Sequence, residues 1–136
     1  MGQCYDVKLK LKFRDGEKDE LRTIKAMQKY IKEHDSKGVI FNLDEWKKEG
    51  NKLYLLEDML RVFFAGWNCW DFEMRQGRKW LKVRNGFDAS YGWESIMLDI
   101  FDVISLFLED GSELWIYLDD DYDHLVVKNG KCVTVH

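Results

Sequence analysis

The stretch that decides the fold is residues 5–14, YDVKLKLKFR, in which apolar and charged residues alternate. A period of two is typical of a β-strand with one buried and one exposed face. The side chains predicted to face the core are Tyr5, Val7, Leu9, Leu11 and Phe13, and those predicted to face away are Asp6, Lys8, Lys10, Lys12 and Arg14. The sequence therefore begins with a half-buried strand that needs helices to cover it.

Apolar residues spaced three and four positions apart predict three amphipathic helices, over residues 21–31, 56–64 and 96–108. Shorter alternating runs predict strands over residues 70–74, 80–83, 113–118, 125–127 and 132–135. Asn129-Gly130 is the strongest hairpin signal in the chain.

Three weaker signals complete the local predictions. Residues 39–41 are predicted to form a short strand, and Asn42 with Glu45 is typical of a capping box that opens a brief helix. Asn85-Gly86 is interpreted as a turn that leads into a loop over residues 87–93.

The predicted order is strand, helix, short irregular insert, helix, two strands, helix, three strands. Strands joined by tight turns imply a mainly antiparallel sheet with helices packed on one face. The fold class is therefore α+β, ferredoxin-like with an insert and an extra C-terminal hairpin. At 136 residues, without a linker or repeat, the chain is expected to be a single domain over residues 1–136.

Composition excludes several classes of protein. Apolar residues make up 46 % of the chain, and six Trp, eight Phe and six Tyr exclude a disordered chain. No run approaches the ~18 apolar residues of a membrane span, so we expect a cytoplasmic protein. Cys4, Cys69 and Cys132 are too widely spaced to indicate a disulfide framework or a metal site. The final hairpin leaves a sheet edge that is compatible with a homodimer.

Three segments of the C-terminal half resemble a known group of proteins: residues 79–83 (KWLKV), 87–94 (FDASYGWE) and 109–112 (EDGS). The group consists of small ferredoxin-like proteins of phages, plasmids and other mobile elements, the YubB-like proteins. The resemblance covers at most about half of the chain. It implies an accessory role in a mobile element and carries over no functional residue.

The charges are distributed unevenly along the chain. Residues 85–127 contain eleven acidic residues and no Lys or Arg, although the whole chain has a net charge of only −4. Carboxylates gathered on one surface would attract a basic partner. The alternatives are that the acids form a solvated face or neutralise the lysines of the first strand.

The leading hypothesis is a non-enzymatic accessory protein that binds a basic host protein through an acidic surface. A host defence nuclease would be one such target, which would make the chain an inhibitor of the anti-CRISPR or anti-restriction type. The predicted partner-binding residues are Asp119, Asp120, Asp121, Asp123, Glu109, Asp110, Glu113 and Trp93. One or two of Trp67, Trp70, Trp80 and Trp93 are expected to be partly exposed, in the first place Trp67 or Trp93, because each of these two lies in a predicted loop.

Two other hypotheses remain open. A metal-dependent hydrolase could use residues 119–123, although the calcium-loop pattern fails, since His124 and Gly130 stand where Gly and Glu are needed. No cofactor or catalytic motif is present, so no catalytic residue, metal or cofactor is predicted. A nucleic-acid-binding domain could use Lys8, Lys10 and Lys12, but the negative net charge argues against nucleic acid as the partner, and lysines often protect an edge strand from pairing.

Overall fold

The computed structural model describes residues 2–66 and 71–135. Its elements follow the predicted order. They are β1 (Gly2–Leu11), α1 (Gly16–His34), α2 (Leu43–Lys48), α3 (Leu56–Phe64), β2 (Glu73–Gln76), β3 (Leu81–Ser90), α4 (Trp93–Ile104), the short 3₁₀ helix η1 (Ser105–Phe107), β4 (Glu113–Leu118), β5 (Asp121–Lys128) and β6 (Lys131–Thr134).

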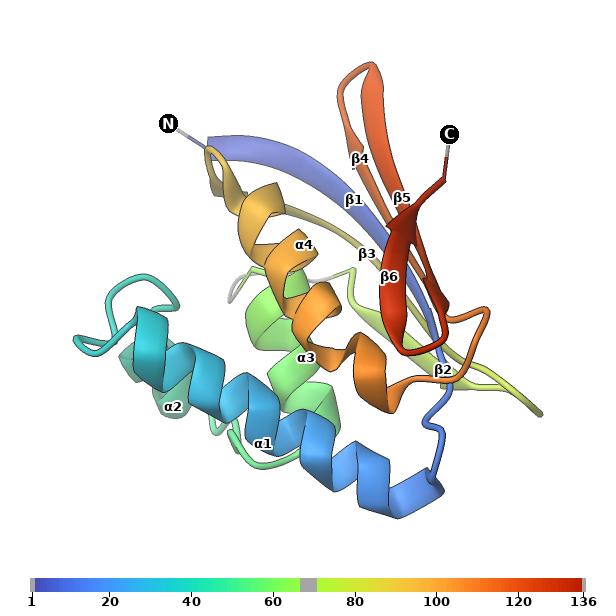
Figure 1. Ribbon diagram of the computed structural model, residues 1–136. Helices are drawn as coiled ribbons and strands as arrows, with labels where there is room; N and C mark the ends of the chain where they lie inside the picture. Colours follow the sequence, from blue (N-terminus) through green and yellow to red (C-terminus); the bar gives the residue numbers. More distant parts are fainter. Residues whose placement is uncertain (1, 67–70, 136) are drawn as a thin grey trace.

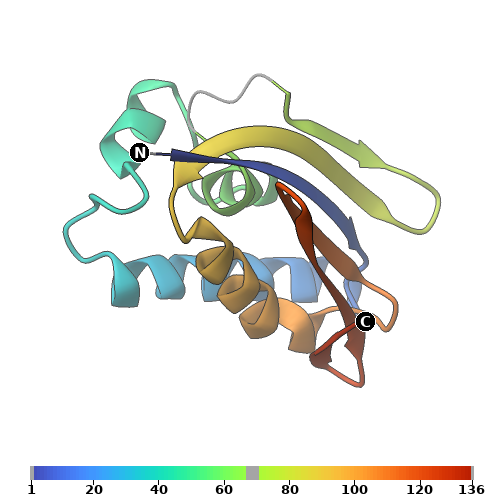
Figure 2. The same ribbon diagram turned by 90° about the horizontal axis from the view of Figure 1, so that it is seen from above.

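The six strands form one sheet in the order β2-β3-β1-β4-β5-β6, and every neighbouring pair is antiparallel. The order β2-β3-β1-β4 is that of a ferredoxin-like sheet, and the β5–β6 hairpin extends it beyond β4. The predicted fold class is confirmed. Helices α1, α3 and α4 lie on one side of the sheet, and no described element covers the other side (Figures 1 and 2).

The core lies between the sheet and these helices. Because β1 is the central strand, its apolar side chains are fully covered: Val7 is 0 % exposed and Leu11 is 1 % exposed. They join one cluster with buried residues of α1, α3 and α4, among them Met97 and Phe101. None of the helices in the described part of the chain is long and apolar enough to cross a membrane.

A polar contact ties the start of β1 to the start of α4. The hydroxyl of Tyr5 donates to Glu94 at 2.6 Å and accepts a hydrogen bond from the backbone N–H of Trp93 at 3.1 Å. Burial, helped by the hydrogen bond to Glu94, raises the pKa of Tyr5 to about 12. The first turn of α4 is thus fixed against the central strand.

The structure corrects two predictions in the segment after α1. Residues 39–41 form no strand, because Asp35 accepts hydrogen bonds from the backbone N–H groups of Val39, Ile40 and Phe41 at 2.9–3.1 Å. Helix α2 is present, but Asn42 has a left-handed backbone (φ 51°) and makes no side-chain cap. The predicted capping box is therefore wrong, whereas the predicted helix is confirmed.

The predicted Asn85-Gly86 turn is also wrong. Both residues lie inside β3, opposite Val7 and Asp6 of β1. Asn85 is buried and its side-chain amide donates to the carbonyl of Phe64 at 2.6 Å. A Cβ on Gly86 would lie 2.8 Å from the Asp6 carboxylate, so a larger residue here would require the exposed Asp6 side chain to move.

The buried Asp35 carboxylate gives a test of the fold. We expect Asp35→Asn to lower the free energy of unfolding by about 1.5–3 kcal/mol, because the charge is lost and one of the two accepting oxygens becomes an NH2 group that faces a backbone N–H. Urea titration measures the change. The exposed Asp44→Asn is the control and should stay within about 0.5 kcal/mol of wild type. Equal stability of the two variants would contradict this role for Asp35.

Candidate functional site

The side chains on the uncovered face of the sheet form rows across the strands, because the register sets them directly opposite one another. One row contains Glu73, Arg84, Lys8, Trp115 and His124. The next row contains Arg75, Lys82, Lys10, Glu113 and Val126.

Three strands bring positive charges directly against one another in these rows. Lys8 of β1 lies opposite Arg84 of β3. Lys82 of β3 has a cation on either side, Lys10 on β1 and Arg75 on β2. Like charges directly opposite each other destabilise a sheet by roughly 0.2–1 kcal/mol per pair. Destabilising charge pairs in the middle of a sheet indicate that these residues contribute to binding and not to stability.

These cations have few partners in the described chain. Lys10 lies 3.9 Å from Glu113, whereas Lys8, Arg75, Lys82 and Arg84 have no described carboxylate within 4.0 Å. Their charge is therefore available to an anionic ligand.

The cations surround a hollow of about 380 Å³, which we name the basic groove. Its lining residues are Lys8, Leu9, Lys10, Glu73, Arg75, Lys82, Val83, Arg84, Glu113 and Trp115. Nucleotide-sized and drug-sized ligands occupy hollows of about 300–1,000 Å³. The basic groove can therefore receive one such group.

An aromatic cluster of Trp115, Tyr117, Tyr122 and His124 continues the same face beyond the basic groove. The Trp115 and His124 rings stack with centroids 3.4 Å apart, and Tyr117 and Tyr122 lie 6.1 Å apart. Lys8 lies over the Tyr117 ring, 5.6 Å from its centroid. Tyr122 is 56 % exposed, so the cluster offers aromatic surface to solvent.

Glu113 stands where the basic groove meets the aromatic cluster. Its carboxylate accepts a hydrogen bond from the Trp115 indole at 3.3 Å and lies 3.7 Å from Nε2 of His124. Nε2 of His124 is buried and has no hydrogen-bond partner among the described residues. A carboxylate in a cationic groove would repel phosphate but can accept hydrogen bonds from an uncharged donor.

The place of β1 in the sheet excludes one explanation of its lysines. Lysines that prevent pairing belong on edge strands. β1 is hydrogen-bonded to β3 on one side and to β4 on the other, so edge protection does not explain Lys8 or Lys10. The interpretation of these lysines as edge protection is wrong.

The opposite end of the uncovered face is negative. Asp88 accepts a hydrogen bond from the Cys4 thiol at 2.9 Å and raises the pKa of that thiol, and Asp119 and Asp6 act in the same direction. Asp119, Asp120, Asp121 and Asp123 lie on and beside the β4–β5 turn, and we name this group the acidic tip. Asp121 and Asp123 pair with Leu118 and Ile116, so their side chains lie on the helical side of the sheet, opposite to that of Tyr122. Burial, Glu94 and Asp121 together raise the pKa of Asp123.

The eleven acids of residues 85–127 do not share one surface. Asp99 and Asp102 lie on α4, on the helical side of the sheet, and accept hydrogen bonds from Tyr30 and Cys132. Three predicted partner-binding residues lie at the far end of β4, roughly 20 Å from the acidic tip. There Glu109 pairs with Lys12 at 3.3 Å, Glu113 pairs with Lys10, and Asp110 accepts the Asn129 N–H. A partner-binding role for these residues stays a prediction.

The structure places Trp93 inside the protein. It is 8 % exposed, and its indole donates to the Phe63 carbonyl at 2.9 Å, so the expectation of an exposed Trp93 is wrong. Trp93 starts a helix instead of lying in a loop. Trp67, Trp70 and Cys69 lie outside the described residues.

The geometry gives no support to the hydrolase hypothesis. In residues 2–66 and 71–135 no group of three His, Cys, Asp or Glu side chains is arranged to hold a metal ion. The residues 119–123 are divided between a turn and the start of β5, whose alternation turns successive side chains to opposite faces.

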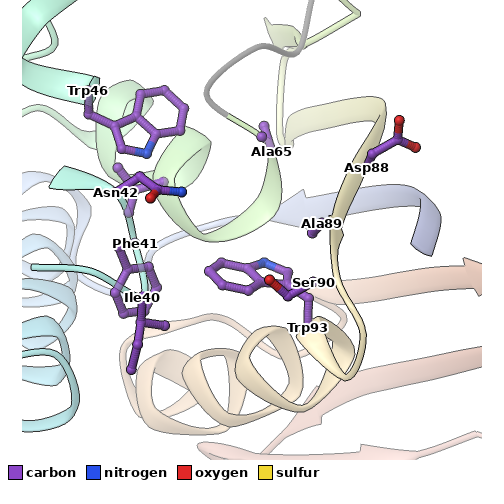
Figure 3. A pocket seen from close by; sticks show the side chains of 11 residues that line it. Ile40, Phe41, Asn42, Trp46, Ala65, Asp88, Ala89, Ser90 and Trp93 are labelled. Atoms are coloured by element: carbon purple, nitrogen blue, oxygen red, sulfur yellow. The ribbon is translucent and has the colours of Figure 1, made fainter. Parts of the chain in front are cut away.

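A second hollow, of about 180 Å³, lies between α2, α3 and the junction of β3 with α4. Figure 3 shows the rings of Phe41, Trp46 and Trp93 facing it, with Asp88 and Ser90 on the β3 side. The hollow is small, and the Trp93 indole N–H is already bonded to the carbonyl of Phe63. The basic groove is therefore the stronger candidate site.

Comparison with known proteins adds no identity. No protein-family model, curated protein or solved structure matches the chain. The site is therefore interpreted from its own geometry.

The uncompensated cations of the basic groove give a test that needs no ligand. We expect Lys82→Gln to raise the free energy of unfolding by about 0.3–1 kcal/mol at low salt, because Lys82 faces a cation on both neighbouring strands. The gain should shrink as salt rises, since salt screens exposed charges.

Urea titration at two salt concentrations measures this effect. Lys25→Gln, an exposed change of the same kind on α1, is the matched control and should leave stability nearly unchanged. A Lys82→Gln variant that is less stable than wild type would show that the cations are compensated.

Proposed function

We propose that this protein binds single-stranded nucleic acid on the uncovered face of its sheet. The observation that carries the proposal is the contact between two surfaces on adjacent strands. The basic groove sets like charges opposite one another, and the aromatic cluster begins in the same row. This combination of a cationic track and stacking rings is what single strands require.

The basic groove suits the phosphate backbone. Lys8 and Lys10 follow one strand about 6.6 Å apart, and Arg84 and Lys82 face them across a strand spacing of about 4.8 Å. A chain of phosphates lying between these rows would contact cations from both strands. It would also relieve the repulsion between them, so binding would recover the free energy that the bare sheet loses.

The aromatic cluster suits unpaired bases. Stacking of a base on an aromatic side chain contributes roughly 1–3 kcal/mol, and every base has a face that can stack. Bases of a duplex are already stacked on one another and are not free for such contacts. The cluster therefore favours a single strand over a duplex.

The negative net charge does not oppose this proposal. Binding depends on the local potential of a surface, and the cations of the basic groove are grouped on three adjacent strands. The carboxylates of Asp6 and Asp88 lie on this face toward the start of β1 and would repel phosphates. They would confine a bound strand to the other end of the face.

The test is fluorescence anisotropy with labelled RNA and DNA strands of about 12 nucleotides and with a duplex of the same sequence. We expect wild type to prefer the single strands. Lys8→Gln with Lys82→Gln should weaken binding on the order of tenfold and lower the salt slope by about 1.4, since each lost phosphate contact removes about 0.7. Lys25→Gln with Lys29→Gln on α1 is the charge-matched control.

Tyr122→Ala tests the stacking part, and Tyr54→Ala is its control because Tyr54 is similarly exposed, at 62 %, away from the sheet. Loss of affinity only in Tyr122→Ala supports a stacking surface. Tighter binding of the duplex, or equal loss in both charge variants, would refute the proposal.

A second candidate function is inhibition of a basic host protein, such as a defence nuclease of the anti-CRISPR or anti-restriction target class, through the acidic tip. Asp119 and Asp120 form the turn and Asp121 begins β5, and the raised pKa of Asp123 reflects burial and the nearby carboxylates of Glu94 and Asp121. This local negative potential supports the candidate.

Its test is capture of partners from bacterial lysate by wild type and by a variant in which the four aspartates of the tip are asparagines. The capture should weaken with salt and disappear in the variant. A captured protein that both forms retain at moderate salt would contradict a role for the acidic tip.

A further inference from the structure

We infer that Glu113 reads a guanine base and gives the basic groove a sequence preference. This inference deepens the proposed function and rests on it. The observation behind it is a carboxylate placed among cations that would otherwise bind phosphate, beside the first ring of the aromatic cluster.

Glu113 retains hydrogen-bonding capacity after its contacts within the protein are counted. A carboxylate has about four acceptor positions. One oxygen accepts the Trp115 indole N–H at 3.3 Å, and the other lies 3.9 Å from Nζ of Lys10, beyond hydrogen-bond distance. The side chain is 27 % exposed, so a ligand in the groove can reach it.

His124 provides a second, independent observation that supports a ligand-binding role for the Glu113 carboxylate. The imidazole is about nine-tenths buried under Trp115, and its unpartnered Nε2 lies 3.7 Å from the Glu113 carboxylate. Buried polar atoms of this kind are rare in folded proteins. The Trp115 indole thus holds one oxygen of Glu113, and the unpartnered Nε2 of His124 faces the same carboxylate.

A base stacked on the aromatic cluster would bring its edge against Glu113. Among the four bases, guanine has two adjacent N–H donors on its Watson–Crick edge, at N1 and N2, which match the two carboxylate oxygens. Lys10, beside the carboxylate, can donate to the guanine O6. Adenine, cytosine and uracil or thymine each offer only one donor group on that edge.

The experiment uses wild-type protein and strands of about 12 nucleotides. Each strand is uniform in uracil or thymine except for one central base, which is guanine, adenine, cytosine or hypoxanthine. RNA and DNA sets distinguish the two sources of such a strand. We expect the guanine strand to bind on the order of tenfold more tightly than the others, since a bidentate contact gives discrimination of that size.

Hypoxanthine lacks the N2 amine, so it should lose much of this advantage in wild type. In Glu113→Gln, whose amide offers a donor in place of one acceptor, guanine and hypoxanthine should bind equally. The strands without guanine should bind to Glu113→Gln at least as tightly as they bind to wild type. Glu57→Gln, which removes an exposed carboxylate on α3 outside the groove, is the control and should keep the preference.

Failure of the inferred role of Glu113 and failure of the proposed binding of single strands give different results. If wild type binds all the strands with equal affinity, the role of Glu113 is overturned and the proposed function stands. If wild type binds no single strand, the proposed function itself falls. If Glu113→Gln does not fold, the comparison of the guanine and hypoxanthine strands in wild type still tests the inferred contact to the N2 amine of guanine.

Discussion

β1 is hydrogen-bonded on both sides, and its alternate side chains must therefore satisfy two opposite environments. Val7, Leu9 and Leu11 are sealed under the helices, while Lys8 and Lys10 stand in the middle of the uncovered face. If β1 shifted so as to separate its lysines from the cations of β3, its apolar side chains would lose their positions in the core. The core thus holds the cations of β1 and β3 against one another, and the site follows from that constraint.

The uncovered face combines three kinds of surface, two of them side by side across the strands and the third at one end of the strands. Cations gather where β1, β2 and β3 meet, aromatic rings occupy β4 and β5, and carboxylates lie at the end where β1 begins. This order gives the face a polarity, because an anionic ligand is attracted at one end and repelled at the other. On the helical side, Asp99 and Asp102 accept hydrogen bonds from Tyr30 and Cys132.

Much of the fold could be predicted from the sequence because its strong signals are local. The alternation in residues 5–14 and the stripe of α4 each report one face of one element. Asn85-Gly86 misled because tertiary pairing with Asp6 overrode its turn preference. The prediction for the segment after α1 was wrong because the Asp35 carboxylate accepts hydrogen bonds from three backbone N–H groups. Nothing in the local sequence indicates that role.

The site was harder to predict because it depends on which strands are neighbours. Lys8, Lys10 and Lys82 are visible as basic residues, yet nothing local sets Lys82 beside Lys10. Trp115 and Tyr117 alternate with core residues in β4, and that pattern could have identified them as residues of the uncovered face. The count of eleven acids was misleading, since β4 separates Glu113 from Asp119 and α4 turns others to the far side.

The central claim is that the uncovered face of the sheet, and no other surface, receives the ligand. Its most direct test is an NMR titration of isotope-labelled protein with a single-stranded oligonucleotide. The account predicts that amide and side-chain signals of β1, β3, β4 and β5 shift together and saturate, while those of the outer side of α1 stay in place. Shifts confined to the helices or to the acidic tip would contradict it.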